Sequence, residues 1–151
     1  TDRKEGIDIL WVVDDSATMY EEHELLMNSA ESFIGFVANT TVDYRLAVVS
    51  TDYEEDAGQL QGAVLTPESM GMVDTFISQI EMERAGSRDE RGFDAAIAGA
   101  NPITNPDFAR TKADLELVIF SDEDVTACAS VYAFLTFFSW VAVSSFNLSI
   151  E

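Results

Sequence analysis

The chain has 151 residues, of which 28 are acidic and 8 basic, so its net charge is −20. This length predicts a single domain with a sizeable core, and the 47% hydrophobic content is typical of a globular protein. The charge excludes the basic surface that nucleic-acid binding requires and disfavours an anionic membrane surface. It suits a halophilic or a secreted setting. We expect an extracytoplasmic location (secreted, periplasmic or cell surface). The single cysteine, Cys128, excludes an internal disulfide.

The N-terminal part of the chain contains one polar segment and one apolar run. Residues 1–6 are polar and expected to be disordered, so the domain is predicted to span 7–151. Ile7 to Val13 is a short apolar run that predicts a buried strand. That strand would deliver Asp14 to its carboxyl end, where open α/β sheets bind their ligands.

Two hydroxyl residues follow this aspartate at alternate positions. They are Ser16 and Thr18. An amphipathic helix is predicted to follow, over about 18–38. Thr18 and Glu21 have the spacing of a helix capping box. As an alternative, Ser16 and Thr18 could simply cap this helix, and Asp14 could be an ordinary turn residue.

The middle of the chain predicts further alternating strands and helices. Strands are expected at Val42 to Ser50 and Leu115 to Phe120, with an antiparallel edge segment at Gln59 to Leu65. One helix is expected to start at Thr66-Pro67-Glu68, with a buried stripe of Val73, Phe76, Ile77 and Ile80. Another is expected after Gly92, with an apolar side of Phe93, Ala96, Ile97 and Ala100. The acidic segment Asp52 to Gly58 is interpreted as a solvated loop rather than a second cation site, because the twelfth position of a calcium loop falls on Ala63.

The C-terminal quarter contains no charged residue from Thr126 to Ile150. No Lys or Arg flanks this stretch, and polar residues follow Val143 too soon for a membrane span. We therefore predict a buried helix, with Val131, Phe134, Leu135 and Phe138 at helical spacing, and then a half-exposed strand at Phe146 to Ile150. Alternating strands and helices predict a doubly wound, mostly parallel sheet with helices on both faces.

The motif Asp14-x-Ser16-x-Thr18 after a hydrophobic strand resembles the metal-ion-dependent adhesion site of von Willebrand factor type A domains, with Thr18 in place of a serine. The resemblance implies two further ligands. Gly86-Ser87 before Gly92 matches the hydroxyl loop, and Asp122 after Phe120 matches the third loop, as in bacterial members. Family members continue with one more strand and a closing helix, which this sequence, ending at Glu151, is expected to lack.

This donor set predicts how the site would act. Two carboxylates and three hydroxyls suit Mg²⁺, or alternatively Mn²⁺ or Ca²⁺. They leave the cation under-neutralised, so it can accept an Asp or Glu from a protein partner. The resemblance thus implies an adhesion module rather than an enzyme. An ordinary loop serine remains the alternative for Ser87, and a turn residue for Asp122.

A response-regulator receiver domain is the alternative family, because Val12 to Met19 also resembles its Mg²⁺-binding opening. A receiver needs a phosphoacceptor Asp after its third strand and a Lys that closes the final strand. Asp52 follows a strand but lacks the expected Met-Pro turn, and of the only two lysines, Lys4 and Lys112, the second precedes its strand. The catalytic parts of a receiver are therefore missing. His23, the only histidine, has no motif that predicts a catalytic triad.

Overall fold

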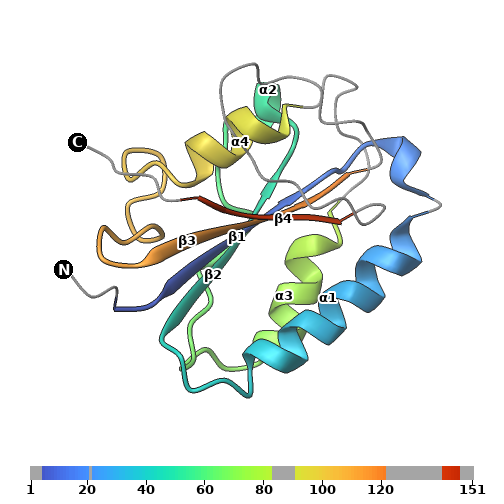
Figure 1. Ribbon diagram of the computed structural model, residues 1–151. Helices are drawn as coiled ribbons and strands as arrows, with labels where there is room; N and C mark the ends of the chain where they lie inside the picture. The colour runs from blue at the N-terminus through green and yellow to red at the C-terminus, as the bar shows by residue number, and fades with distance from the viewer. Residues whose placement is uncertain (1–4, 21, 83–90, 122–140, 147–151) are drawn as a thin grey trace.

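The protein is an α/β domain built on one sheet, shown in a computed structural model (Figure 1). The structure describes residues 5–20, 22–82, 91–121 and the backbone of 141–146. The strands are β1 (Ile7–Val13), β2 (Tyr44–Ser50), β3 (Asp114–Phe120) and β4 (Val141–Phe146), in the spatial order β2-β1-β3-β4. β1 pairs in parallel with both β2 and β3, whereas β4 is antiparallel to β3. The predicted mostly parallel α/β sheet is confirmed.

Helices cover both faces of the sheet. Figure 1 shows α1 (His23–Val37) and α3 (Met72–Ile80) on one side, with α4 (Gly92–Gly99) and the short α2 (Tyr53–Asp56) on the other. Successive residues of β1 point to opposite faces, so Trp11 packs under α1 and α3 while Leu10 and Val12 pack under α4. Two buried faces explain why these strands are continuously apolar.

An aromatic cluster of Trp11, Phe33 and Phe76 joins β1 to α1 and α3. The ring of Trp11 lies 5.0 Å from that of Phe33 and 5.2 Å, edge-on, from that of Phe76. Within the described residues the buried indole Nε1 has no hydrogen-bond partner. The rings instead contribute through burial and edge-to-face contact.

Two helices begin later than the sequence predicted. The segment expected to open the first helix forms a 3-10 turn, η1 (Ala17–Tyr20), and α1 begins only at His23 without a side-chain cap. The alternative interpretation of Thr18 as the cap of this helix is therefore wrong. Similarly, Thr66 closes a turn by accepting the Ser69 amide at its carbonyl, and α3 begins at Met72. Side chains that cap helices also favour turns, so the sequence signal does not distinguish them.

The connection between β2 and α3 runs along the free side of β2. Leu65 and Leu46 exchange two backbone hydrogen bonds of 2.8 Å in an antiparallel bridge. The expected antiparallel edge is thus present as an isolated bridge rather than a strand. Before it, Asp52 caps α2 by accepting the amide of Glu55 at 3.2 Å, and Gly58 adopts a φ of +76° against α4.

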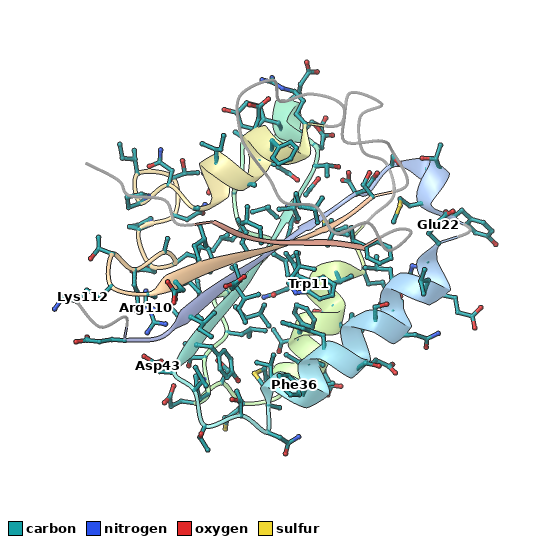
Figure 2. The ribbon with its side chains drawn as sticks, viewed as in Figure 1. Trp11, Glu22, Phe36, Asp43, Arg110 and Lys112 are labelled. Carbon is teal, nitrogen blue, oxygen red and sulfur yellow. The ribbon has the colours of Figure 1, made fainter. Side chains whose placement is uncertain are left out.

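The amino-terminal end of the sheet is held by an ion pair. Asp8 is 1% exposed and accepts hydrogen bonds from the backbone N–H of Arg110 at 2.6 Å and from its Nε at 2.8 Å. The same guanidinium also binds the exposed carboxylate of Asp43. Figure 2 shows Arg110 and Asp43 at the end of the sheet away from Glu22. This contact fixes the loop before β3 to both β1 and the start of β2.

The last strand differs from the prediction. A strand was expected from Phe146 and a helix through the preceding apolar run, yet β4 begins at Val141. An apolar run lacks a period that separates a buried strand from a buried helix, which explains the error. The predicted helix residues Val131, Phe134, Leu135 and Phe138 lie outside the described residues.

Among the residues that the structure describes, no helix has the length and apolar character needed to cross a membrane.

Candidate metal centre

The carboxyl ends of β1 and β3 bring two polar side chains together. The backbone N–H of Asp14 donates to the carbonyl of Phe120 at 2.9 Å, which extends the strand pairing by one step. Ser121 Oγ then donates to Asp14 Oδ2 at 2.7 Å. Asp14 is 2% exposed, so its carboxylate is held inside the protein at the edge of the sheet. Sequence analysis did not assign Ser121 a role. The available signal was only its place directly after the apolar run that ends at Phe120.

The turn after β1 brings the two predicted hydroxyls to the same place. The backbone N–H of Ser16 donates to Asp14 Oδ1 at 2.9 Å, and Ser16 Oγ shares a hydrogen bond of 2.7 Å with Thr18 Oγ1. The 3-10 turn aims Thr18 back toward Ser16 because the amide of Met19 donates to the carbonyl of Ser16. Met19 is buried and anchors this turn. Three of the five predicted ligands therefore lie together.

The oxygen spacing of this turn fits a hard divalent cation. Mg²⁺ binds six oxygens at 2.0–2.1 Å, so neighbouring ligand oxygens lie about 2.9 Å apart. The Ser16–Thr18 oxygen separation of 2.7 Å is within a few tenths of an ångström of that edge. Both hydroxyls could become neighbouring ligands with a small adjustment. The donor chemistry, a carboxylate and hydroxyls, is that of Mg²⁺, Mn²⁺ or Ca²⁺.

The two remaining predicted ligands, Ser87 and Asp122, lie outside the described residues. In the described part of the chain, no three His, Cys, Asp or Glu side chains converge as a metal-binding group. Asp14 is the only described carboxylate among the predicted ligands, and the other described donors are hydroxyls. The second carboxylate of the site thus remains a prediction from the sequence, at Asp122.

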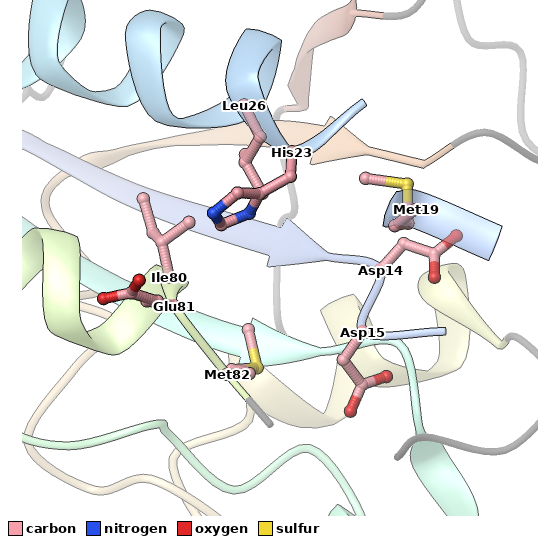
Figure 3. Close-up of a pocket in the computed structure, with 8 residues that line it drawn as sticks. All are labelled: Asp14, Asp15, Met19, His23, Leu26, Ile80, Glu81 and Met82. Carbon is pink, nitrogen blue, oxygen red and sulfur yellow. The ribbon is translucent and has the colours of Figure 1, made fainter. Parts of the chain in front are cut away.

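Asp15 belongs to a separate acidic group beside the centre. Burial raises the pKa of its carboxyl above the usual value of 3.8. A hydrogen bond with Ser50 opposes this pKa rise, and the negative charges of Asp52 and Asp56 add to it. Figure 3 shows the carboxylates of Asp14 and Asp15 pointing apart. Asp15 therefore interacts with Ser50, Asp52 and Asp56, which lie at and just after the end of β2.

A small pocket opens between η1, α1 and the end of α3 (Figure 3). It combines acidic groups, apolar side chains and the only histidine, and its lining residues are Asp14, Asp15, Met19, His23, Leu26, Ile80, Glu81 and Met82. His23 lies between Leu26 and Ile80, and the described residues of the lining include no serine or cysteine. Asp14 belongs to this lining, but Figure 3 shows its carboxylate pointing away from His23 and Ile80.

The fold and this centre together define an α/β domain with oxygen donors at the carboxyl edge of a parallel sheet, the edge where such sheets bind ligands. Comparisons of the chain with protein-family models, with curated proteins and with solved structures found no match.

Proposed function

We propose that this domain binds a divalent cation, Mg²⁺ or alternatively Mn²⁺ or Ca²⁺, and through it an Asp or Glu of a protein partner. The ligands would be Asp14, Ser16, Thr18, Ser87 and Asp122. The observation that supports this most directly is the convergence of Asp14, Ser16 and Thr18 in one turn at the end of the central strand. The fold and the sequence motif supply the rest of the argument.

The choice of hydroxyls over carboxylates favours binding of an external acid. Asp14 and Asp122 would not both bind the cation directly at once, so the cation would stay under-neutralised, and the neutral hydroxyls would add no further negative charge. Mg²⁺ usually retains several waters in protein sites. A carboxylate from another molecule could replace one of them and bind the cation directly.

The protein's charge restricts the partner. A net charge of −20 repels an acidic protein at long range, although salt screens this repulsion beyond about 8 Å at physiological ionic strength. A partner with one exposed Asp or Glu within a neutral or basic surface fits best. Such a partner would gain from both the cation and the surrounding negative surface.

Calorimetry with Mg²⁺, Mn²⁺ and Ca²⁺ tests the cation site. Wild type should bind one cation, and Asp14→Ala should bind it at least roughly 100-fold more weakly, because even groups that only support a ligand change affinity by 10–100-fold. Asp74→Ala is the matched control, since Asp74 is an exposed acid in the first turn of α3. Equal heats for wild type and Asp14→Ala would remove Asp14 from the site.

Peptide binding tests the second step. A fluorescent peptide with one Asp among neutral residues should bind in Mg²⁺, and its Asn counterpart should not. Binding that persists in EDTA, or that is equal for the two peptides, would refute cation-mediated recognition. Beryllofluoride added to the Mg²⁺-saturated protein should leave its amide NMR spectrum unchanged, whereas a receiver-like phosphoacceptor would respond.

A further inference from the structure

Thr51 carries a buried hydroxyl that the fold does not use. The residue follows β2 and is 2% exposed, and within the described residues its Oγ1 has no hydrogen-bond partner. Its backbone is fully engaged, because its N–H donates to Val13 and its carbonyl accepts from Arg91. A buried hydroxyl without a partner is destabilising and rare in native proteins. A bound ligand would explain why one is present here.

The strand register places Thr51 directly beside Asp14. Val13 pairs with Ser50, and the bond from Thr51 N to Val13 O, 3.0 Å long, continues this pairing by one residue. Thr51 therefore lies next to Asp14 on the β2 side, as Ser121 does on the β3 side. The three side chains form one row across the carboxyl ends of the strands.

The row lies on the face of the sheet that α4 covers. Val12 and Val49 point to this face, and alternation places Asp14 and Thr51 there as well. A Cβ built on Gly92, the first residue of α4, would lie 3.5 Å from Thr51 Cγ2 and 3.8 Å from Val12 Cγ1, which agrees with that placement. Within the described residues Thr51 Oγ1 makes no hydrogen bond, including to the Asp14 carboxylate, and the spacing of about 4.8 Å between adjacent strands leaves room for a water to bridge the two side chains.

We propose that the Thr51 hydroxyl positions a water of the Asp14 cation site by accepting a hydrogen bond from it. This inference rests on the proposed function. A cation draws electron density from its bound water and so makes the water a strong donor, which a hydroxyl oxygen can accept. Thr51 is then a positioning residue that acts through the water, and its hydroxyl is satisfied only when the cation is bound.

The test uses two substitutions of Thr51. Thr51→Val keeps the shape and removes the hydroxyl, whereas Thr51→Ser keeps the hydroxyl and serves as the control. Metal-free Thr51→Val should melt about 2–4 °C above wild type, because it removes a buried unpaired group from a chain of this size. Its calorimetric dissociation constant for Mg²⁺ should rise about tenfold. Thr51→Ser should bind Mg²⁺ within about twofold of wild type, well inside the tenfold loss expected of a missing supporting group.

Each result decides the question. A Thr51→Val protein that binds Mg²⁺ as wild type does would overturn the role of Thr51 and leave the proposed function intact. A metal-free Thr51→Val protein that melts below wild type or fails to fold would also overturn it, since the hydroxyl would then have a partner within the protein. Wild type that binds no divalent cation would instead refute the proposed function itself.

Discussion

The ion pair at the amino-terminal end of the sheet gives a sharp stability prediction, because one arginine binds a buried and an exposed carboxylate. Asp8 is 1% exposed, whereas the side chain of Asp43 is 62% exposed. Breaking a buried pair costs about 3–5 kcal/mol because it leaves an uncompensated charge. An exposed pair contributes about 0–1 kcal/mol. Asp8→Asn should therefore lower the free energy of unfolding by about 3 kcal/mol or more, and Asp43→Asn by less than about 1 kcal/mol.

Urea unfolding and thermal melting, followed by circular dichroism at pH 7 in EDTA, measure this difference. For a chain of this size each kcal/mol shifts the melting temperature by about 2–4 °C, so Asp8→Asn should melt roughly 6–20 °C below wild type. Asp43→Asn should melt within about 4 °C of wild type. Equal losses for the two substitutions would show that burial does not govern the strength of this ion pair.

Three further predictions concern two glycines with positive φ, the buried carboxyl of Asp15 and cation binding at Asp14. Gly58→Ala should lower the free energy of unfolding by at least about 3 kcal/mol, because Gly58 has a φ of +76° and a Cβ there would lie 2.4 Å from Ala98 Cβ. Gly71→Ala, with a φ of +62° but open space, should cost only about 1–2 kcal/mol, and equal urea midpoints would contradict this. Because burial raises the pKa of Asp15, its contribution to stability is full below about pH 3.8 and is lost as the pH rises through the raised pKa. In EDTA, the free energy of unfolding of Asp15→Asn measured in urea should therefore rise relative to that of wild type as the pH rises from 3 to 7. A difference between the two proteins that does not change with pH would refute this. Finally, Mg²⁺ at 100 times its dissociation constant should stabilise wild type by about 2.7 kcal/mol and leave Asp14→Ala unchanged; an equal rise in both proteins would point to binding elsewhere.

The strands were predictable because their apolar runs are continuous. Burial on both faces leaves little choice of residue in β1, β2 and β3, and the predicted bounds differ from the observed ones by at most two residues. The helix stripes were predicted less well. Ile97 was placed on the apolar side of α4 but is exposed.

Close packing explains this error. A Cβ on Gly99 would lie 3.0 Å from Leu10 Cδ2 and from Val49 Cγ1, so α4 approaches the sheet through small residues. Ala95 and Ala96 fill the contact, and the larger Ile97 faces outward. Hydrophobicity alone predicts that the largest apolar side chain faces inward, and it does not include the distance between helix and sheet.

The local part of the candidate site was predictable and the long-range part was not. Asp14, Ser16 and Thr18 fall within five residues, so one motif and one turn bring them together. Ser121 and Thr51 reach the same place only through the pairing of β1 with β3 and β2. Register between distant strands cannot be read from either segment alone, so neither residue was assigned a role. Ser87 and Asp122 stay predictions.

The contact between Asp14 and Ser121 has a consequence for folding, because 107 positions separate the two residues. Closing so long a loop costs entropy that only the complete β1–β3 ladder repays. During synthesis from the N-terminus, the motif after β1 emerges long before its partner strand exists. The turn can form early, but the enclosed carboxylate is assembled only when β3 docks, so this centre should be among the last parts of the domain to acquire its native geometry.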